Sequence, residues 1–233
     1  MNDLNWYNEL SEYLKISREA IVSVFGDIDI NKQWRERKSD THFYSETNYY
    51  LYDLTNYVND AGRMRYVEQL KNFIKTKSLK TALDYGCGIG TDIIAMYEAG
   101  IENMTAIDIY SASTQYMYWR LQNRKIIKGL MFYNIKNDDD YPKDLPKVDI
   151  GVCVAMLEHC QNPQAILREL VRVCKYLVLR VDPSNPGNAH PMHIEKNFPF
   201  LRAIDGENPE IIKEYGLKRI QDISEMPLFE IVK

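Results

Sequence analysis

Hydrophobic residues recur every three or four positions in two parts of the N-terminal third of the chain, a spacing typical of amphipathic helices. They are Leu10, Tyr13, Leu14, Ile21, Val22 and Phe25 in the first part, and Met64, Val67, Leu70 and Ile74 in the second. The second set predicts a helix from about Arg63 to Lys75. The stretch between, residues 39–60, mixes aromatic and polar side chains without a clear period and predicts no particular element.

From residue 80 onward, short apolar runs alternate with helical patterns of ten to fifteen residues. Strands are predicted at 81–85, 104–110, 130–135, 148–156, 175–181, 216–223 and 227–233, and helices at 92–100, 113–125, 163–174 and 207–215. This alternation predicts right-handed crossovers and an α/β fold, with seven mainly parallel strands and helices on both faces of the sheet. The last two strands follow each other closely, so we expect an antiparallel hairpin, with Pro227 in its turn.

The change in pattern also predicts how the chain is divided. Residues 1–77 form a helical segment, which we expect to cover a site as a lid, and residues 78–233 form the α/β domain. We find no internal repeat and no low-complexity stretch.

Composition narrows the class of protein. The chain has 233 residues, of which 45% are hydrophobic and 27% charged, with a formal net charge of −4. A globular protein is expected, without general attraction to nucleic acid or anionic lipid. No run is long enough to span a membrane, and the polar N-terminus lacks a signal layout, so we expect a cytoplasmic protein. The four cysteines form no Cys-x-x-Cys pair and are expected to be buried, reduced thiols.

Three glycines at alternate positions separate the first strand from the first helix of the α/β part. Gly86, Gly88 and Gly90 follow Asp84 in the run LDYGCGIG, where the backbone can turn tightly and approach a ligand. The spacing is G-x-G-x-G, not the G-x-G-x-x-G of dinucleotide folds. An acidic residue at the strand end suits a cationic ligand. A purely structural turn is the alternative.

A second acidic residue, Asp108, ends the next strand in AIDIY. At the carboxyl edge of a parallel sheet its two oxygens can accept hydrogen bonds from both hydroxyls of a ribose. The alternative is a helix cap or a solvated strand end.

Together these segments resemble the class I S-adenosylmethionine-dependent methyltransferases over residues 78–233. The matching pieces are LDYGCGIG, AIDIY, VDIGVCVAMLEHCQNP and AILRELVRV. The Leu-Glu-His ending with a downstream Asn-Pro is common in the subgroup that methylates small molecules. Two departures are the missing Pro-Gly-Gly turn before the fifth strand and a loose match between the third and fourth strands.

The resemblance implies a set of cofactor contacts. It comprises Asp84, Gly86, Cys87, Gly88 and Gly90 near the methionine part, Asp108 and Ile109 at the ribose, Ala155, and Asp138 or Asp139 at the adenine amino group. Asp138 and Asp139 belong to an acidic run, NDDDYP at residues 137–142, and the alternative is that this run is simply solvated.

Three histidines are candidates for the substrate side. His159 follows the fourth strand, and a neutral imidazole there can accept a proton from the nucleophile; a structural hydrogen bond is the alternative. His190 and His193, after the fifth strand, are expected to orient or deprotonate the substrate. A weaker alternative makes them metal ligands together with Glu158 or Glu195. Our primary expectation is that the site holds no metal.

Aromatic residues of the N-terminal segment complete the predicted site. Tyr44, Tyr49, Tyr50 and Tyr52 can supply ring faces against a sulfonium or a substrate ring, and Trp34 can add an aromatic wall. Among the tyrosines we favour Tyr44 and Tyr49, so Trp34, Tyr44 and Tyr49 are expected to line the substrate pocket. Packing of the lid onto the sheet is the alternative for each of them.

The sequence therefore predicts an enzyme that transfers a methyl group from S-adenosylmethionine to an oxygen or nitrogen, less favourably a carbon, of a small molecule. The position after the fourth strand reads AMLEH, without the Asn/Asp-Pro-Pro-aromatic motif of enzymes that methylate amino groups of DNA bases or glutamine. Enzymes that methylate cytosine at C5 need a nucleophilic cysteine beside a proline in this region, whereas Cys153 lies in the middle of the predicted strand. An RNA or protein methyltransferase and a non-catalytic cofactor-binding module are the alternatives. Whether two copies of the chain form a homodimer is left open.

Overall fold

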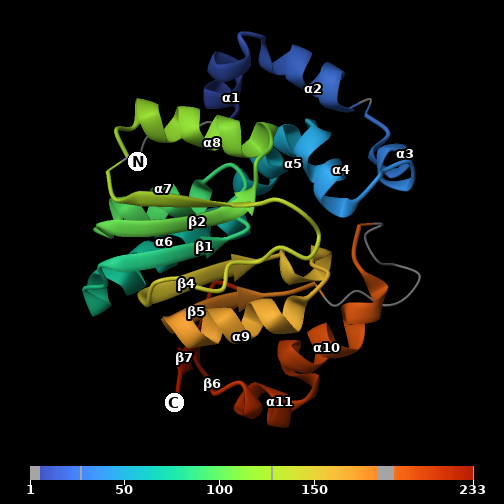
Figure 1. Cartoon of the computed structure of the whole chain (residues 1–233). Coiled ribbons are helices and arrows are strands. Elements are labelled where there is room, and N and C mark those ends of the chain that lie inside the picture. Colours follow the sequence, from blue (N-terminus) through green and yellow to red (C-terminus); the bar gives the residue numbers. More distant parts are fainter. Residues whose placement is uncertain (1–5, 27, 127, 183–191, 233) are drawn as a thin grey trace.

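One seven-stranded sheet organises the part of the chain described by the computed structural model, namely residues 6–26, 28–126, 128–182 and 192–232 (Figure 1). The strands are β1 (Thr81–Tyr85), β2 (Asn103–Ile109), β3 (Leu130–Ile135), β4 (Val148–Val154), β5 (Cys174–Arg180), β6 (Leu217–Ile223) and β7 (Met226–Ile231). Their order is β3-β2-β1-β4-β5-β7-β6, and only the pairings of β7 with β5 and β6 are antiparallel. The predicted α/β fold with an antiparallel C-terminal hairpin is confirmed.

Both faces of the sheet are buried, which explains why the central strands are almost continuously apolar. Along β4, Ile150 and Val152 pack into one hydrophobic cluster, while Cys153 packs into the other. Successive side chains of a strand point to opposite faces, so one apolar run supplies two cores.

Helices cover the two faces in separate layers (Figure 1). On one face lie α6 (Ala61–Lys77), α7 (Thr91–Glu98) and α8 (Ala112–Asn123); on the other lie α9 (Pro163–Val173), α10 (Phe198–Arg202) and α11 (Pro209–Glu214). Among the described residues, no helix has the length and apolarity needed to cross a membrane. The connection from β3 to β4 contains no helix, so residues 136–147 form a loop that starts at the carboxyl edge of the sheet and returns to its amino edge.

Five short helices precede α6 in the described part of the N-terminal segment. They are α1 (Trp6–Leu14), α2 (Arg18–Gly26), α3 (Ile30–Arg35), α4 (Asp40–Glu46) and α5 (Tyr49–Val58). The stretch for which the sequence predicts no element therefore holds α4 and α5. Side chains of α1, α2 and α5 belong to the same hydrophobic cluster as those of α6 and the sheet, so the core is continuous across residue 77.

The sequence pattern was partly wrong about which helix faces are buried. Leu10, Ile21 and Phe25 are buried, but Val22 is exposed, because Lys15 with φ of 59° ends α1 and α2 starts on a new axis. In α6, Met64 is half exposed. The buried face of this helix is instead formed by Arg63, Tyr66, Leu70, Phe73 and Ile74.

Two C-terminal details also differ from the prediction. Pro227 lies in β7, opposite Asp222, and the turn of the hairpin is Ser224–Glu225. The helix expected at 207–215 is the shorter α11, preceded by α10 and by a wide turn of π type at Ala203–Glu207 that the sequence did not predict. The four cysteines are all buried and unpaired, as expected.

Candidate active site

The glycine loop connects β1 to α7 in a conformation that explains its composition. Gly86 and Gly88 have φ of 83° and 49°, in the left-handed region that favours glycine. A Cβ atom on Gly86 would lie 2.8 Å from the Cγ of Met156, and one on Gly88 would lie 2.9 Å from Leu54 Cδ1. Gly90, also left-handed, begins α7 without a side-chain cap. The loop therefore brings bare backbone against the cleft above the strand ends.

Asp108 ends β2 directly beside this loop. Its carboxylate accepts hydrogen bonds of 2.7 Å from the backbone N–H groups of Gly88 and Ile109. Burial raises the pKa of Asp108 to about 6, although these two hydrogen bonds lower it. The carboxylate is thus held at the edge of the cleft where a ribose would lie.

A buried charge cluster lies under the methionine end of the predicted cofactor site. Asp84, in β1, is 3% exposed, and burial together with the nearby Asp92 raises its pKa well above its usual range. Arg63, from α6, forms a 2.5 Å ion pair with Asp92, and both side chains are 6% exposed. A guanidinium at this position offers a partner for the carboxylate of an amino acid.

Two adjoining cavities open above the carboxyl ends of β1, β2 and β4. The first has a volume of about 160 Å³, and Asp108, Ile135 and Asp138 are among its lining residues. The second, about 580 Å³, is lined by Asp84 and Arg63 together with other residues. Residues from three parts of the chain line both cavities: Tyr50, Leu54, Gly86, Gly88, Ala155 and His159. The strand order reverses between β1 and β4, where open α/β sheets bind their ligands.

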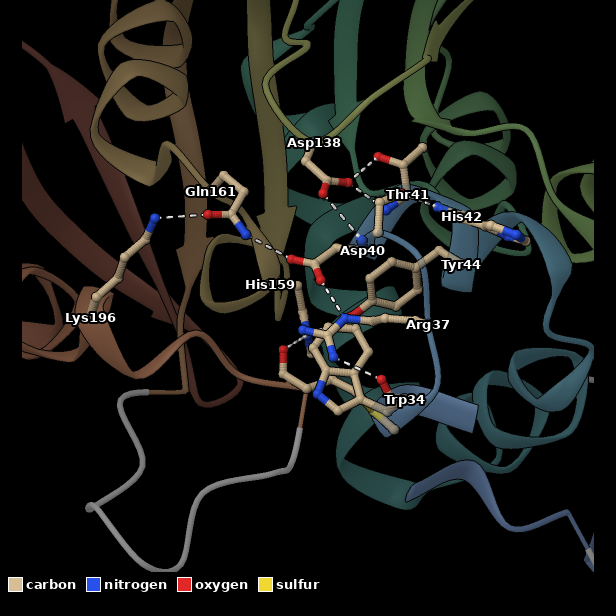
Figure 2. Close-up of polar contacts among 12 residues, drawn as sticks. Trp34, Arg37, Asp40, Thr41, His42, Tyr44, Asp138, His159, Gln161 and Lys196 are labelled. Atoms are coloured by element: carbon tan, nitrogen blue, oxygen red, sulfur yellow. Dashed lines mark hydrogen bonds and ion pairs between the residues drawn. The ribbon is translucent and has the colours of Figure 1, made fainter. Parts of the chain in front are cut away.

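The two candidates for the adenine contact, Asp138 and Asp139, both lie in the acidic loop between β3 and β4 but have different surroundings. Asp138 accepts hydrogen bonds from the backbone N–H of Asp40 at 3.2 Å and from the N–H and hydroxyl of Thr41 at 2.6 and 2.7 Å (Figure 2). Burial raises the pKa of Asp138, but the bonds from Thr41 outweigh it and hold the pKa below its usual value. Asp139 is exposed and is not among the residues that line either cavity. Asp138 thus joins the loop to α4 at the rim of the site.

Of the three candidate histidines, the described residues include two, and the structure brings them together. His159 ends a short helical turn after β4 (Leu157–His159), and its ring centroid lies 4.8 Å from that of His193. The Nδ1 atom of His159 lies 2.9 Å from the hydroxyl of Tyr44 and 3.2 Å from the carbonyl oxygen of Met192. His159 lines both cavities and His193 the larger one. His190 lies outside the described residues.

The three aromatic candidates have different positions. Tyr44 lines the smaller cavity. Trp34 is buried behind it against Phe43, with the guanidinium of Arg37 stacked 3.4 Å from its ring centroid. Tyr49 is absent from the described lining of both cavities, whereas its neighbour Tyr50 lines both. The structure therefore places Tyr44 at the site and puts Tyr50 where the sequence suggested Tyr49.

Sequence reasoning missed Arg63 and Leu54, and it favoured Tyr49 over Tyr50 among the candidate tyrosines. A signal for Arg63 was present, because it lies three and seven residues before the apolar Tyr66 and Leu70 on the buried face of α6. A charged residue in register with an apolar face is buried only with a partner, here Asp92. For Tyr50 and Leu54 no local signal distinguishes them from their neighbours.

This sheet order, with a glycine loop after β1, an acid at the end of β2 and a cleft above both, defines a class I methyltransferase. A family model described as a methyltransferase domain matches residues 59–220, and the chain belongs to this family. The chain is an S-adenosylmethionine-dependent methyltransferase. A search of curated proteins finds no match.

Solved structures support the same fold at low sequence identity. A candidate caffeoyl-CoA O-methyltransferase from Staphylococcus aureus aligns with a TM-score of 0.54 at 14% identity, covering 79% of this chain and 98% of that one. Magnesium protoporphyrin IX methyltransferase from Synechocystis, with bound cofactor, aligns with a TM-score of 0.50 at 16% identity, covering 91% of this chain and 94% of that one.

Proposed function

We propose that this enzyme methylates an oxygen or nitrogen atom of a small molecule. The observation that carries the proposal is the cover over the cleft: Tyr44 from α4 and Tyr50 and Leu54 from α5 line the cavities that the glycine loop and Asp108 also line. A substrate must reach the methyl group beneath these helices, which favours a small molecule over a folded protein or a nucleic-acid duplex. The acidic net charge agrees with this.

We propose the following placement of the cofactor. The ribose hydroxyls donate to Asp108, the adenine lies in the smaller cavity near Asp138, and the methionine part lies beside Asp84. The amino group of that part is cationic and its carboxylate anionic, which suits the neighbouring Asp84 and Arg63 respectively. The helices before α6 then form the cover, as the sequence division at residue 77 suggests, although α6 itself packs on the sheet.

The chemistry requires mainly alignment of the nucleophile with the methyl carbon. The carbon–sulfur bond breaks with its electron pair remaining on sulfur, a new bond forms to the substrate oxygen or nitrogen, and the proton of that atom passes to water in the cleft. His159 and His193 face this space and would orient the nucleophile. The names of the two structural neighbours, a candidate caffeoyl-CoA O-methyltransferase and a magnesium protoporphyrin IX methyltransferase, are consistent with small substrates on this fold.

The proposal is tested by separating binding from transfer. Calorimetry should show binding of S-adenosylmethionine and S-adenosylhomocysteine but not of NAD. Incubation with methyl-labelled cofactor and a cell extract, fractionated into small molecules, RNA and protein, should then label the small-molecule fraction. Label in the RNA or protein fraction alone would reject the substrate class. The cytoplasmic location expected from the sequence stays a prediction.

A further inference from the structure

Three side chains of metal-ligand type meet beside the larger cavity. Glu158 and His159 belong to the turn after β4, and His193 belongs to the segment that follows β5. One ligand atom from each lies within 4.8 Å of the others. The backbone N–H of Ile194 donates to the carbonyl of Glu158 at 2.9 Å, which ties the two segments together. The cluster is therefore built by the fold and does not depend on exposed, adjustable side chains alone.

Glu158 shows the clearest need for a ligand. Its side chain is fully buried, and its Oε1 accepts a 3.1 Å hydrogen bond from the backbone N–H of Asp182. Its Oε2 is also buried, and no described residue donates a hydrogen bond to it. A buried carboxylate oxygen without a donor is destabilising, most of all when charged, unless a proton or a cation satisfies it.

His159 is oriented as metal-binding imidazoles usually are. A carbonyl only accepts, so the 3.2 Å contact with the Met192 oxygen places the ring proton on Nδ1 and the lone pair on Nε2. Metal-ligating histidines typically donate their other N–H to a carbonyl or carboxylate in this way. The Tyr44 hydroxyl, 2.9 Å from the same Nδ1, adds a second support from α4.

We propose that Glu158, His159 and His193 bind one divalent transition-metal ion. Two imidazoles and one carboxylate are the donor set of several zinc and non-haem iron sites. Ligand bonds of about 2.1 Å hold such atoms within about 4.2 Å of one another, so the observed 4.8 Å needs only a small side-chain rotation. His159 and His193 line the cavity, which leaves coordination positions open toward the substrate.

The ion would define the substrate class within the proposed function, on which this role rests. A substrate hydroxyl bound to a divalent cation is more acidic and is fixed in place. The methyl group then passes from sulfur to that oxygen, and the hydroxyl proton passes to water in the open cleft. The enzyme would thus act on a hydroxylated small molecule, with the two imidazoles serving as ligands and not as proton acceptors.

The test is direct metal binding to the full-length chain after treatment with a chelator. Titration with Zn²⁺ and with Mn²⁺, followed by calorimetry and, for Mn²⁺, by electron paramagnetic resonance, should show one site per chain. Glu158→Gln and His193→Ala should each weaken binding by at least about tenfold, the loss seen even when only a supporting residue is removed. His42→Gln, which removes an imidazole on α4 outside the cluster, should bind as the wild type does.

Three outcomes decide the proposal. Absence of a stoichiometric site for both ions would overturn it and leave Glu158 in a hydrogen-bonded network with the histidines. Equal binding by His193→Ala and His42→Gln would overturn it as well. Because S-adenosylhomocysteine affinity should be retained in all three variants, it reports correct folding. Metal binding without methyl transfer to any small molecule would instead contradict the proposed function and leave the site standing.

Discussion

Asp108 combines two demands on one carboxylate. Its oxygens already hold the glycine loop through the N–H groups of Gly88 and Ile109, and they also face the cavity. Burial raises the pKa to about 6, so the group changes charge close to neutral pH. Above that pH the carboxylate accepts hydrogen bonds from ribose hydroxyls, and below it the protonated form accepts them more weakly.

We therefore predict that affinity for S-adenosylhomocysteine falls as pH is lowered through 6, by at most about tenfold per pH unit for one proton. Asp108→Asn should bind S-adenosylhomocysteine more weakly at pH 7.5 and show a much flatter pH dependence. Any pH dependence that remains in this variant would come from Asp84, whose pKa is also raised. Calorimetry between pH 5 and 8 measures both proteins. Equal pH dependence in the two would contradict the role of Asp108.

The element that the tertiary structure adds to the site is α4. Asp138 receives three hydrogen bonds from its first turn, and Asp40 accepts a 2.8 Å bond from Gln161, which follows His159 by two residues (Figure 2). Gln161 in turn accepts a 2.7 Å bond from Lys196. The helix is thus joined to the loops after β3, β4 and β5 over the cleft.

We predict that Asp138→Ala loosens α4 without unfolding the sheet. Hydrogen bonds to a charged group contribute about 1.5–3 kcal/mol, so amide exchange at Asp40 and Thr41 should quicken by roughly tenfold to a hundredfold. Hydrogen exchange followed by mass spectrometry measures this. Asp139→Ala, an exposed carboxylate one position along, is the matched control and should leave exchange in α4 unchanged. Similar exchange in both variants would show that Asp138 does not hold the helix.

Across the whole molecule, α1, α2 and α5 share one hydrophobic cluster with one face of the sheet. Glu9 of α1 accepts a 3.1 Å hydrogen bond from Arg120 of α8, whose side chain is fully buried, and a 2.6 Å bond from Arg124. The Arg120 guanidinium also lies 4.2 Å from the ring centroid of Trp6. Removing the acid leaves a buried cation without its counter-charge.

We predict that Glu9→Gln lowers the free energy of unfolding by about 1.5–3 kcal/mol. Urea unfolding followed by tryptophan fluorescence and by circular dichroism should give coincident transitions, because α1 and the sheet share a hydrophobic cluster. Glu12→Gln changes an exposed carboxylate of the same helix and should alter stability by under about 0.5 kcal/mol. Separate transitions for the two probes would contradict a common core.

Local pattern was enough for the framework of the fold and for part of the cofactor side. Apolar runs alternating with helical patterns predicted the strands, since the period of burial is a property of each segment. Backbone geometry explains why Gly86 and Gly88 could be recognised: their conformation and close contacts require glycine whatever surrounds them. The end of each strand likewise placed Asp84 and Asp108 at the correct edge of the sheet.

Tertiary packing alone decided the remainder. Tyr44 meets His159, and Thr41 meets Asp138, across about a hundred residues of chain, and no local pattern encodes such pairs. The choice of Tyr50 over Tyr49 depends on how α5 is rotated when its apolar face docks, and the choice of Asp138 over Asp139 depends on how the loop after β3 meets α4. The sequence thus determined the elements and the loop chemistry, whereas the cover over the cleft and the Glu158–His159–His193 cluster exist only because segments distant in the chain pack against one another.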